Sequence, residues 1–274
     1  MALSCSNCAH YQNWVPSAAQ SWVGVHQLIQ LFLGLLLISL ACAGRANERV
    51  DIPSVHGSPT RVLIASHQAA TATVLLFIGG GGLVRIADDG RTDHIHTFVR
   101  SFGMWRDYAV QAVLVDSPFD LGNALRGHKR SSKEHLDRVS EVIRHFRSKS
   151  GQPIWIFGHS MGTSTVAAFL SSERPEISLL NGYIVAGTHK GESIPASIKL
   201  PALGIHHRRE ACPSTPISAS ESIIRSRSSD TPRAMVLLDG GNDQGDRCQA
   251  LAYHGFNGIE QELVKTAAEF ILKN

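Results

Sequence analysis

The sequence predicts an α/β protein built around a mostly parallel sheet, and two observations carry this prediction. Short runs rich in apolar and β-branched residues alternate along the chain with longer amphipathic runs of helical period. Such alternation is typical of βαβ units around a parallel sheet. The chain has 274 residues, 43% of them hydrophobic, which suits one α/β domain with a substantial core.

The apolar runs predict the strands, and the amphipathic runs predict the helices. The predicted strands cover residues 49–55, 60–66, 73–78, 109–115, 153–157, 182–186, 202–206 and 234–238. The first two are short, close together and half polar, so we expect them to form an antiparallel edge. The predicted helices cover residues 132–147, 162–172, 218–227 and 259–272, each with apolar positions at helical spacing or a small-residue face.

The charge balance gives no sign of a nucleic-acid partner. The formal net charge is only +3, and it is spread evenly along the chain. The one basic cluster, residues 126–133, is interpreted as a solvated loop before a helix.

An uncharged apolar run at residues 28–43 predicts export. It is short for a membrane span but has the length of a secretory core segment, and it ends in the small residues Ala41-Cys42-Ala43. We therefore divide the chain into a signal or anchor region, residues 1–43, and a domain of residues 44–274. An uncleaved anchor, or a lipid anchor through Cys42, would leave the protein at a membrane; a cleaved signal makes it periplasmic or secreted.

The cysteines fit an exported protein. Cys5 and Cys8 form a C-x-x-C before the apolar run, but no second pair has metal-ligand spacing, so a zinc or redox role is not expected. After cleavage Cys212 and Cys248 would remain, and an even pair in an oxidising compartment predicts a disulfide. The alternative is two free thiols in a reducing compartment.

A candidate nucleophile stands at Ser160, in the pattern Gly158-His159-Ser160-Met161-Gly162. The five-residue string is weak by itself, but a buried-strand pattern precedes it and a helical pattern follows it. The glycines permit the steep turn that would lift the serine hydroxyl to the carboxyl edge of the sheet.

A serine hydroxyl needs a histidine base within reach. His254 is the candidate, because it follows the last predicted strand and so arrives at the same edge of the sheet as Ser160. His159 should point away from the nucleophile, and His206 and His207 should shape the site or pack beside it. A further pair, His94 and His96, has no third ligand at useful spacing, so we predict neither a metal nor another cofactor.

The carboxylate that orients the base is less determined. Glu210 follows the penultimate strand, which gives the chain order serine, acid, histidine. Asp243 is the main rival, since it lies in a turn after the last strand. Other candidates are Asp239, Asp246 and Glu192. A disulfide between Cys212 and Cys248 would tie the Glu210 loop to the His254 loop.

Two backbone amides should form an oxyanion hole. Met161, directly after the nucleophile, supplies one. The other is expected from the four glycines that follow the third strand, with Gly80 and Gly81 as candidates. A phosphate-binding loop is the competing interpretation, but neither G-K-[S/T] nor G-x-G-x-x-G follows.

Together these residues resemble the α/β-hydrolase superfamily: GGGG after the third strand, GHSMG at the elbow, the acid in HHRREAC and the base in AYHGF. The resemblance covers residues 49–274 and implies an eight-stranded, mostly parallel sheet with helices on both faces. The connection from residue 186 to residue 202 leaves no room for a large cap. Two departures are Glu210, where members more often carry aspartate, and Ile78, where they often carry a histidine before the glycines.

The sequence therefore predicts an exported serine hydrolase that cleaves an ester or similar acyl bond of a small molecule through an acyl-enzyme. Ser160 would attack, His254 would carry the proton and Glu210 would orient His254. Thioesterases, peptidases and acyltransferases use the same groups, and an envelope binding protein could keep the fold without turnover.

Overall fold

The computed structural model describes residues 47–117 and 127–274. One compact unit spans Ala46–Asn274. The predicted signal or anchor region, and the predicted boundary between residues 43 and 44, lie outside the described residues. Within the described ranges, no helix is both long and apolar enough to cross a membrane.

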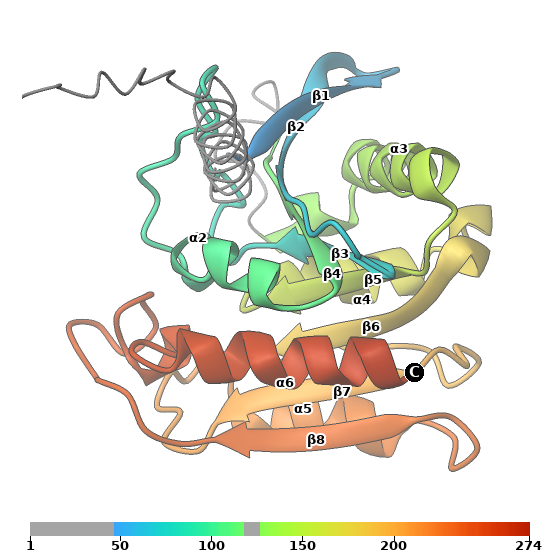
Figure 1. The fold of residues 1–274 in the computed structure, drawn as a ribbon. Helices are drawn as coiled ribbons and strands as arrows, with labels where there is room; N and C mark the ends of the chain where they lie inside the picture. The colour runs from blue at the N-terminus through green and yellow to red at the C-terminus, as the bar shows by residue number, and fades with distance from the viewer. Residues whose placement is uncertain (1–46, 118–126) are drawn as a thin grey trace, which may run out of the picture. The chain divides into compact units, whose positions relative to one another are not determined.

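The unit is built on one eight-stranded sheet in the order β1-β2-β4-β3-β5-β6-β7-β8 (Figure 1). The strands are β1 (Glu48–Ser54), β2 (Gly57–Ala65), β3 (Ala72–Phe77), β4 (Val110–Val115), β5 (Ile154–His159), β6 (Leu180–Ala186), β7 (Ala202–His207) and β8 (Arg233–Leu238). β2 runs antiparallel to both β1 and β4, and every pair from β4 to β8 is parallel. The predicted fold class and its antiparallel edge are confirmed.

Helices cover both faces of the sheet. They are α2 (Thr97–Arg100), α3 (Lys133–Ser150), α4 (Gly162–Leu170), α5 (Ile217–Arg225) and α6 (Glu260–Lys273), with short 3-10 helices η1 (Phe102–Asp107), η3 (Gly127–Ser131), η4 (Pro175–Leu179) and η5 (Tyr253–Gly255). One core cluster joins the sheet to α6, α2 and η1, and a second joins it to α3, α4 and α5. β5 serves both, since Trp155 and Phe157 enter the first cluster and Ile154 and Ile156 the second.

The four longer helices lie where the sequence pattern predicts them, whereas α2 and the 3-10 helices were not predicted. These elements have three to six residues, too few for helical periodicity to show in the sequence. α2 is instead stabilised at its N-terminus, where the side chain of His96 accepts a hydrogen bond from the Phe98 amide.

Parallel strands place their carboxyl ends at one edge of the sheet, and this edge collects the predicted site. The glycine loop follows β3, Ser160 follows β5, Glu210 follows β7 and His254 follows β8. Functional side chains of open parallel sheets gather at this edge because each strand delivers its following loop there.

Behind this edge, α3 and α4 share a buried polar contact. His135 of α3 places Nε2 3.1 Å from the Thr165 hydroxyl oxygen of α4, and the same hydroxyl accepts a hydrogen bond from Arg130. Burial lowers the pKa of His135 to about 3, and the charges of Arg130 and Arg138 act in the same direction. His135 is therefore neutral in the folded protein at any pH near neutrality.

We predict that the protein loses stability in mild acid partly through His135. The unfolded chain takes up a proton near pH 6.5 and the folded chain does not, so stability is intact above that pH and falls as the pH drops below it. Between pH 7 and pH 5 the His135 contribution is about 2 kcal/mol. Urea unfolding at both pH values should show a smaller loss for His135→Gln than for the wild type. Equal losses would contradict the assignment.

Candidate active site at the carboxyl edge of the sheet

Ser160 lies on a steep turn between β5 and α4, and the glycines around it make the turn possible. Its backbone is left-handed, with φ 53°. A Cβ at Gly162 would lie 2.0 Å from the carbonyl oxygen of Phe77 at the end of β3, and one at Gly158 would lie 2.4 Å from the Gly162 carbonyl. Only glycine allows α4 to start this close to the sheet, and this close start turns Ser160 outward.

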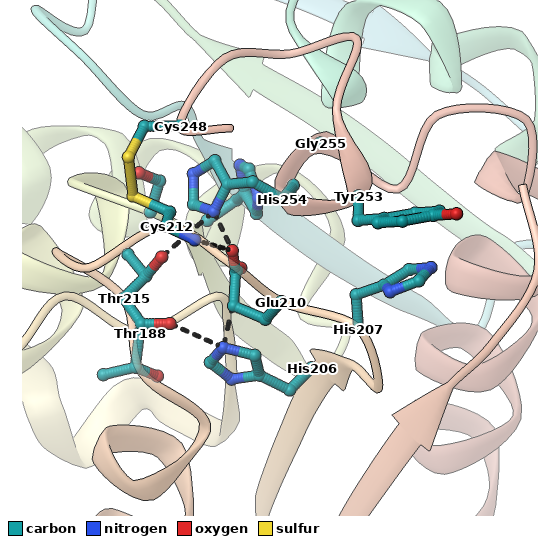
Figure 2. A network of polar contacts seen from close by, with 12 residues as sticks. Thr188, His206, His207, Glu210, Cys212, Thr215, Cys248, Tyr253, His254 and Gly255 are labelled. Carbon is teal, nitrogen blue, oxygen red and sulfur yellow. Dashed lines mark hydrogen bonds and ion pairs between the residues drawn. A yellow bond between two sulfur atoms is a disulfide. The ribbon is translucent and has the colours of Figure 1, made fainter. Parts of the chain in front are cut away.

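The loop after β8 brings His254 to the same edge, in η5. Its ring is buried, and its Nδ1 lies 2.9 Å from Oε2 of Glu210 and 3.1 Å from the hydroxyl oxygen of Thr215 (Figure 2). A carboxylate can only accept, so Nδ1 carries the proton. The other nitrogen of the neutral ring, Nε2, then has a lone pair and can act as a base.

Glu210 is held as an anion. Its side chain is 2% exposed, and its second oxygen accepts a hydrogen bond of 2.8 Å from the Cys212 amide. Burial by itself would raise the pKa of Glu210, but the hydrogen bond and charge of His254, together with the Cys212 amide, hold it below its ordinary value.

A neighbouring histidine leaves this pair undisturbed. His206 Nε2 donates to the Thr215 carbonyl at 2.9 Å, while its Nδ1 lies 2.9 Å from the Ser220 hydroxyl oxygen. Burial lowers the pKa of His206, so it stays neutral although its Nε2 lies 3.7 Å from Glu210 Oε2. The charge of Glu210 is thus directed to His254.

The rival carboxylates do not reach His254. Asp243 is exposed and accepts a hydrogen bond from the Tyr253 amide at 3.3 Å. Asp239 pairs with Arg208 and Arg209, and Asp246 accepts from the Cys248 amide. Glu192 accepts from the Ser164 hydroxyl. Among the predicted acids, the structure places Glu210 alone against His254.

The predicted disulfide between Cys212 and Cys248 is present (Figure 2). It joins the loop that carries Glu210 to the loop that carries His254. The ring of His207 adds a second contact between these loops, since it stacks on Tyr253 with centroids 4.5 Å apart. These links restrict the motion of the acid relative to the base.

Ser160 and His254 line a common cavity of about 430 Å³. Within the described part of the chain no hydrogen bond joins their side chains. Catalytic hydrogen bonds are often long before substrate binds, so the shared cavity, and not a formed contact, relates the two residues.

Three backbone amides beside the serine are available to a ligand. Gly80, Gly81 and Met161 all line the cavity, and none of their N–H groups donates to a described residue. Gly80 has φ +57°, and nothing lies within 4 Å of the position its Cβ would take. Amides without a protein acceptor beside the serine are one requirement of an oxyanion hole.

Arg130 fixes the glycine loop from behind, so its interpretation as part of a solvated loop is wrong. It is 2% exposed, and its guanidinium donates to the carbonyls of Ile78 and Gly80 at 3.1 and 2.8 Å. With the Gly80 carbonyl turned inward, the amide that follows it, that of Gly81, is left free to face the cavity. Burial lowers the pKa of Arg130 to about 9, so the guanidinium remains charged at neutral pH.

A chain of buried histidines holds His254 from the other side. His159 donates from Nε2 to the His254 carbonyl at 2.9 Å, because a carbonyl can only accept. Its Nδ1 lies 3.0 Å from Nε2 of His96, and burial lowers the pKa of both rings. The Phe98 amide donates to His96 Nδ1. His96 Nε2 lies 3.0 Å from both the Gly79 amide nitrogen and His159 Nδ1.

The sequence did not reveal Arg130, His96 or Thr215 as parts of the site. His96 stands beside Gly79, where the resemblance leads one to expect a histidine just before the glycines, but it comes from a loop 17 residues further along the chain. His94 and His96 remain a pair without a metal site: no group of three or more His, Cys, Asp or Glu in residues 47–117 and 127–274 could hold an ion.

Solved structures resemble this chain in fold. No protein-family model and no curated protein matches its sequence. A dienelactone hydrolase from Anabaena variabilis gives a TM-score of 0.60 at 14% identity, covering 84% of this chain and 98% of that one. Esterase 2 of Thermogutta terrifontis, phosphonylated by sarin, gives 0.57 at 13%, covering 84% and 95%. An α/β serine hydrolase without lid from Xanthomonas campestris gives 0.52 at 12%, covering 82% and 96%.

We predict that the contact between Gly162 and β3 is essential for stability. Gly162→Ala would press a methyl group against the Phe77 carbonyl and should lower the free energy of unfolding by about 3 kcal/mol. Gly103→Ala is the matched control, since its Cβ would meet nothing nearer than 3.6 Å, and it should change stability by less than about 0.5 kcal/mol. Urea unfolding of both variants measures the difference. Equal effects would show that the contact does not constrain the turn.

Proposed function

We propose that this chain, which has the α/β-hydrolase fold, is a serine hydrolase that cleaves carboxylic esters through an acyl-enzyme. One observation carries the proposal: the Glu210–His254 pair opens on the same cavity as the left-handed Ser160 and the amides of Gly80, Gly81 and Met161. The solved neighbours are hydrolases and esterases, which agrees with the proposal.

The proposed reaction has two halves. The Ser160 Oγ attacks the ester carbonyl while its proton passes to His254 Nε2, and the Oγ–C bond forms as the carbonyl oxygen becomes an oxyanion held by the three amides. The C–O bond to the alcohol then breaks, and His254 gives its proton to the leaving oxygen. Water attacks the acyl-enzyme in the same way and releases the acid and free Ser160. Glu210 stabilises the imidazolium formed in each half.

The described residues include no large cap over the cavity. The connection between β6 and β7, where the sequence predicts no room for a large cap, spans residues 187–201 and contains no helix or strand. The proposed substrates are therefore small or protruding esters. The same groups would attack thioesters and amides. We propose esters over these other acyl bonds because several solved structures of similar fold are esterases.

We also propose that the protein is exported by its N-terminal segment. The apolar run at residues 28–43 supports this proposal, and so does the Cys212–Cys248 disulfide, because such bonds persist in oxidising compartments. The N-terminal sequence of the purified protein would distinguish a cleaved signal from a retained anchor.

We predict that a fluorophosphonate probe labels the protein at Ser160. The phosphorus reagent is attacked by an activated serine and then stays attached. Labelling should be read by gel fluorescence and by mass spectrometry of the modified peptide, with Ser160→Ala as the blank. An unlabelled wild type, or an equally labelled Ser160→Ala protein, would refute the proposed activity.

We predict that Glu210→Gln lowers kcat for ester hydrolysis by roughly 10³- to 10⁴-fold, because an amide no longer stabilises the protonated ring or fixes its tautomer. Asp243→Asn keeps an oxygen that can accept from Tyr253 and should reduce kcat by far less. Steady-state kinetics on an aryl acetate compares them. If Asp243→Asn were the more damaging substitution, the roles of the two acids would have to be exchanged.

A further inference from the structure

The described wall of the Ser160 cavity carries nitrogen donors and no carboxylate. Arg85, His94 and His189 line it beside the glycine loop, and none of its described lining residues is Asp or Glu. Glu192 and Glu210 lie outside the lining, where Ser164 and His254 engage them. Among these lining residues Arg85 carries a permanent positive charge, so this wall offers an anion a charged partner.

The backbone at Arg85 is held in an unusual conformation. Its φ is 61°, in the left-handed region. On either side, the amides of Val84 and Ile86 donate to the two oxygens of Asp116 at 2.6 and 3.0 Å. The Asp116 side chain is buried at the end of β4. A buried carboxylate thus clamps the segment that presents Arg85, and strain of this kind clusters at ligand sites.

The Arg85 guanidinium has no hydrogen bond or ion pair with any described residue. In contrast, Arg61 of β2 bonds Asp51 and the Ile86 carbonyl, and Arg100 bonds Glu260. Arg85 stands, with Leu83, at the wall shared by the Ser160 cavity and a second cavity of about 510 Å³. An arginine free in this way can receive an anion from the Ser160 cavity.

His94 adds a donor beside Arg85. Burial and the charge of Arg85 lower the pKa of His94 against the opposing charges of Asp116 and Asp93, so the ring is neutral near pH 7. Its Nδ1 accepts a hydrogen bond of 3.1 Å from the His96 amide, which leaves the proton on Nε2. This N–H adds a hydrogen-bond donor to the charge of the guanidinium.

We propose that Arg85 selects esters that carry a carboxylate group, such as half-esters of dicarboxylic acids or esters of hydroxy acids. A guanidinium binds a carboxylate through two parallel hydrogen bonds, which gives both affinity and orientation. The anion would anchor one end of the substrate at Arg85, while the ester carbonyl lies between Ser160 and the glycine amides. This proposal rests on the proposed hydrolase activity and assigns its substrate class.

The test compares matched charged and neutral esters. Monoethyl adipate against ethyl hexanoate places the carboxylate on the acyl side, and 4-acetoxybenzoate against its methyl ester places it on the alcohol side. The quantity measured is the selectivity ratio, kcat/KM for the charged ester divided by kcat/KM for the neutral one. The pair with the larger ratio shows on which side Arg85 acts.

We expect a selectivity ratio above about 10 for the wild type on one pair, and a fall of about 10- to 100-fold in Arg85→Gln, the range for a hydrogen bond to a charged group. Arg85→Lys should keep part of the ratio. Arg225→Gln is the control, because it removes the same charge from an exposed i,i+4 pair on α5, and it should leave ratio and activity as in the wild type. Arg85→Gly should raise the melting temperature, since glycine adopts φ 61° without strain, yet lose the ratio.

Different results would overturn the hydrolase activity and the selecting role of Arg85. Ser160-dependent hydrolysis with the same ratio in wild type and Arg85→Gln would overturn the substrate class and leave the hydrolase intact. Absence of Ser160-dependent hydrolysis on all four esters, together with no fluorophosphonate labelling, would overturn both. A ratio that falls equally in Arg225→Gln would show a general charge effect and reject Arg85 as the selecting residue.

Discussion

The close approach of α4 to the end of β3 is the constraint on which the rest of the site depends. Because the Gly162 backbone lies against the Phe77 carbonyl, the chain must leave β5 through a steep turn, and Ser160 takes a left-handed conformation there. The same approach puts the start of α4 beside the loop that follows β3. The serine and the glycine amides thus become neighbours through one backbone contact.

Around this turn the protein buries several histidines and Glu210, and their ring nitrogens and oxygens are hydrogen-bonded in defined donor and acceptor roles. His159 must donate to the His254 carbonyl, and His206 must donate to the Thr215 carbonyl. Both rings are held neutral by burial, which lowers their pKa. Glu210 therefore faces a single hydrogen-bonded imidazole, and its charge acts on the ring that needs it.

Charge in this region is also divided in space. The guanidinium of Arg130 is buried and donates hydrogen bonds to the carbonyls of Ile78 and Gly80, which it holds away from the cavity. Arg85 lies further along the same loop and makes no such contact in the described part of the chain. One arginine thus holds the glycine loop, and the other is open to a ligand of the cavity, although both carry the same guanidinium group. The two arginines differ because Arg130 is buried among carbonyl acceptors, whereas Arg85 has no described acceptor.

The sequence by itself predicted the sheet, the longer helices and a Cys212–Cys248 disulfide, and it singled out Ser160 and His254. These predictions follow from local patterns. The hydrophobic period indicates the strands and helices, and the parallel arrangement of the strands indicates which loops share an edge. The sequence left Glu210 and Asp243 as rivals, since both follow strands that end at that edge. Only the tertiary structure separated them, through the 2.9 Å contact between Glu210 and His254. It alone also revealed Arg130, His96 and the clamp of Asp116 on Arg85, because these contacts join segments whose spacing in the chain carries no period or motif.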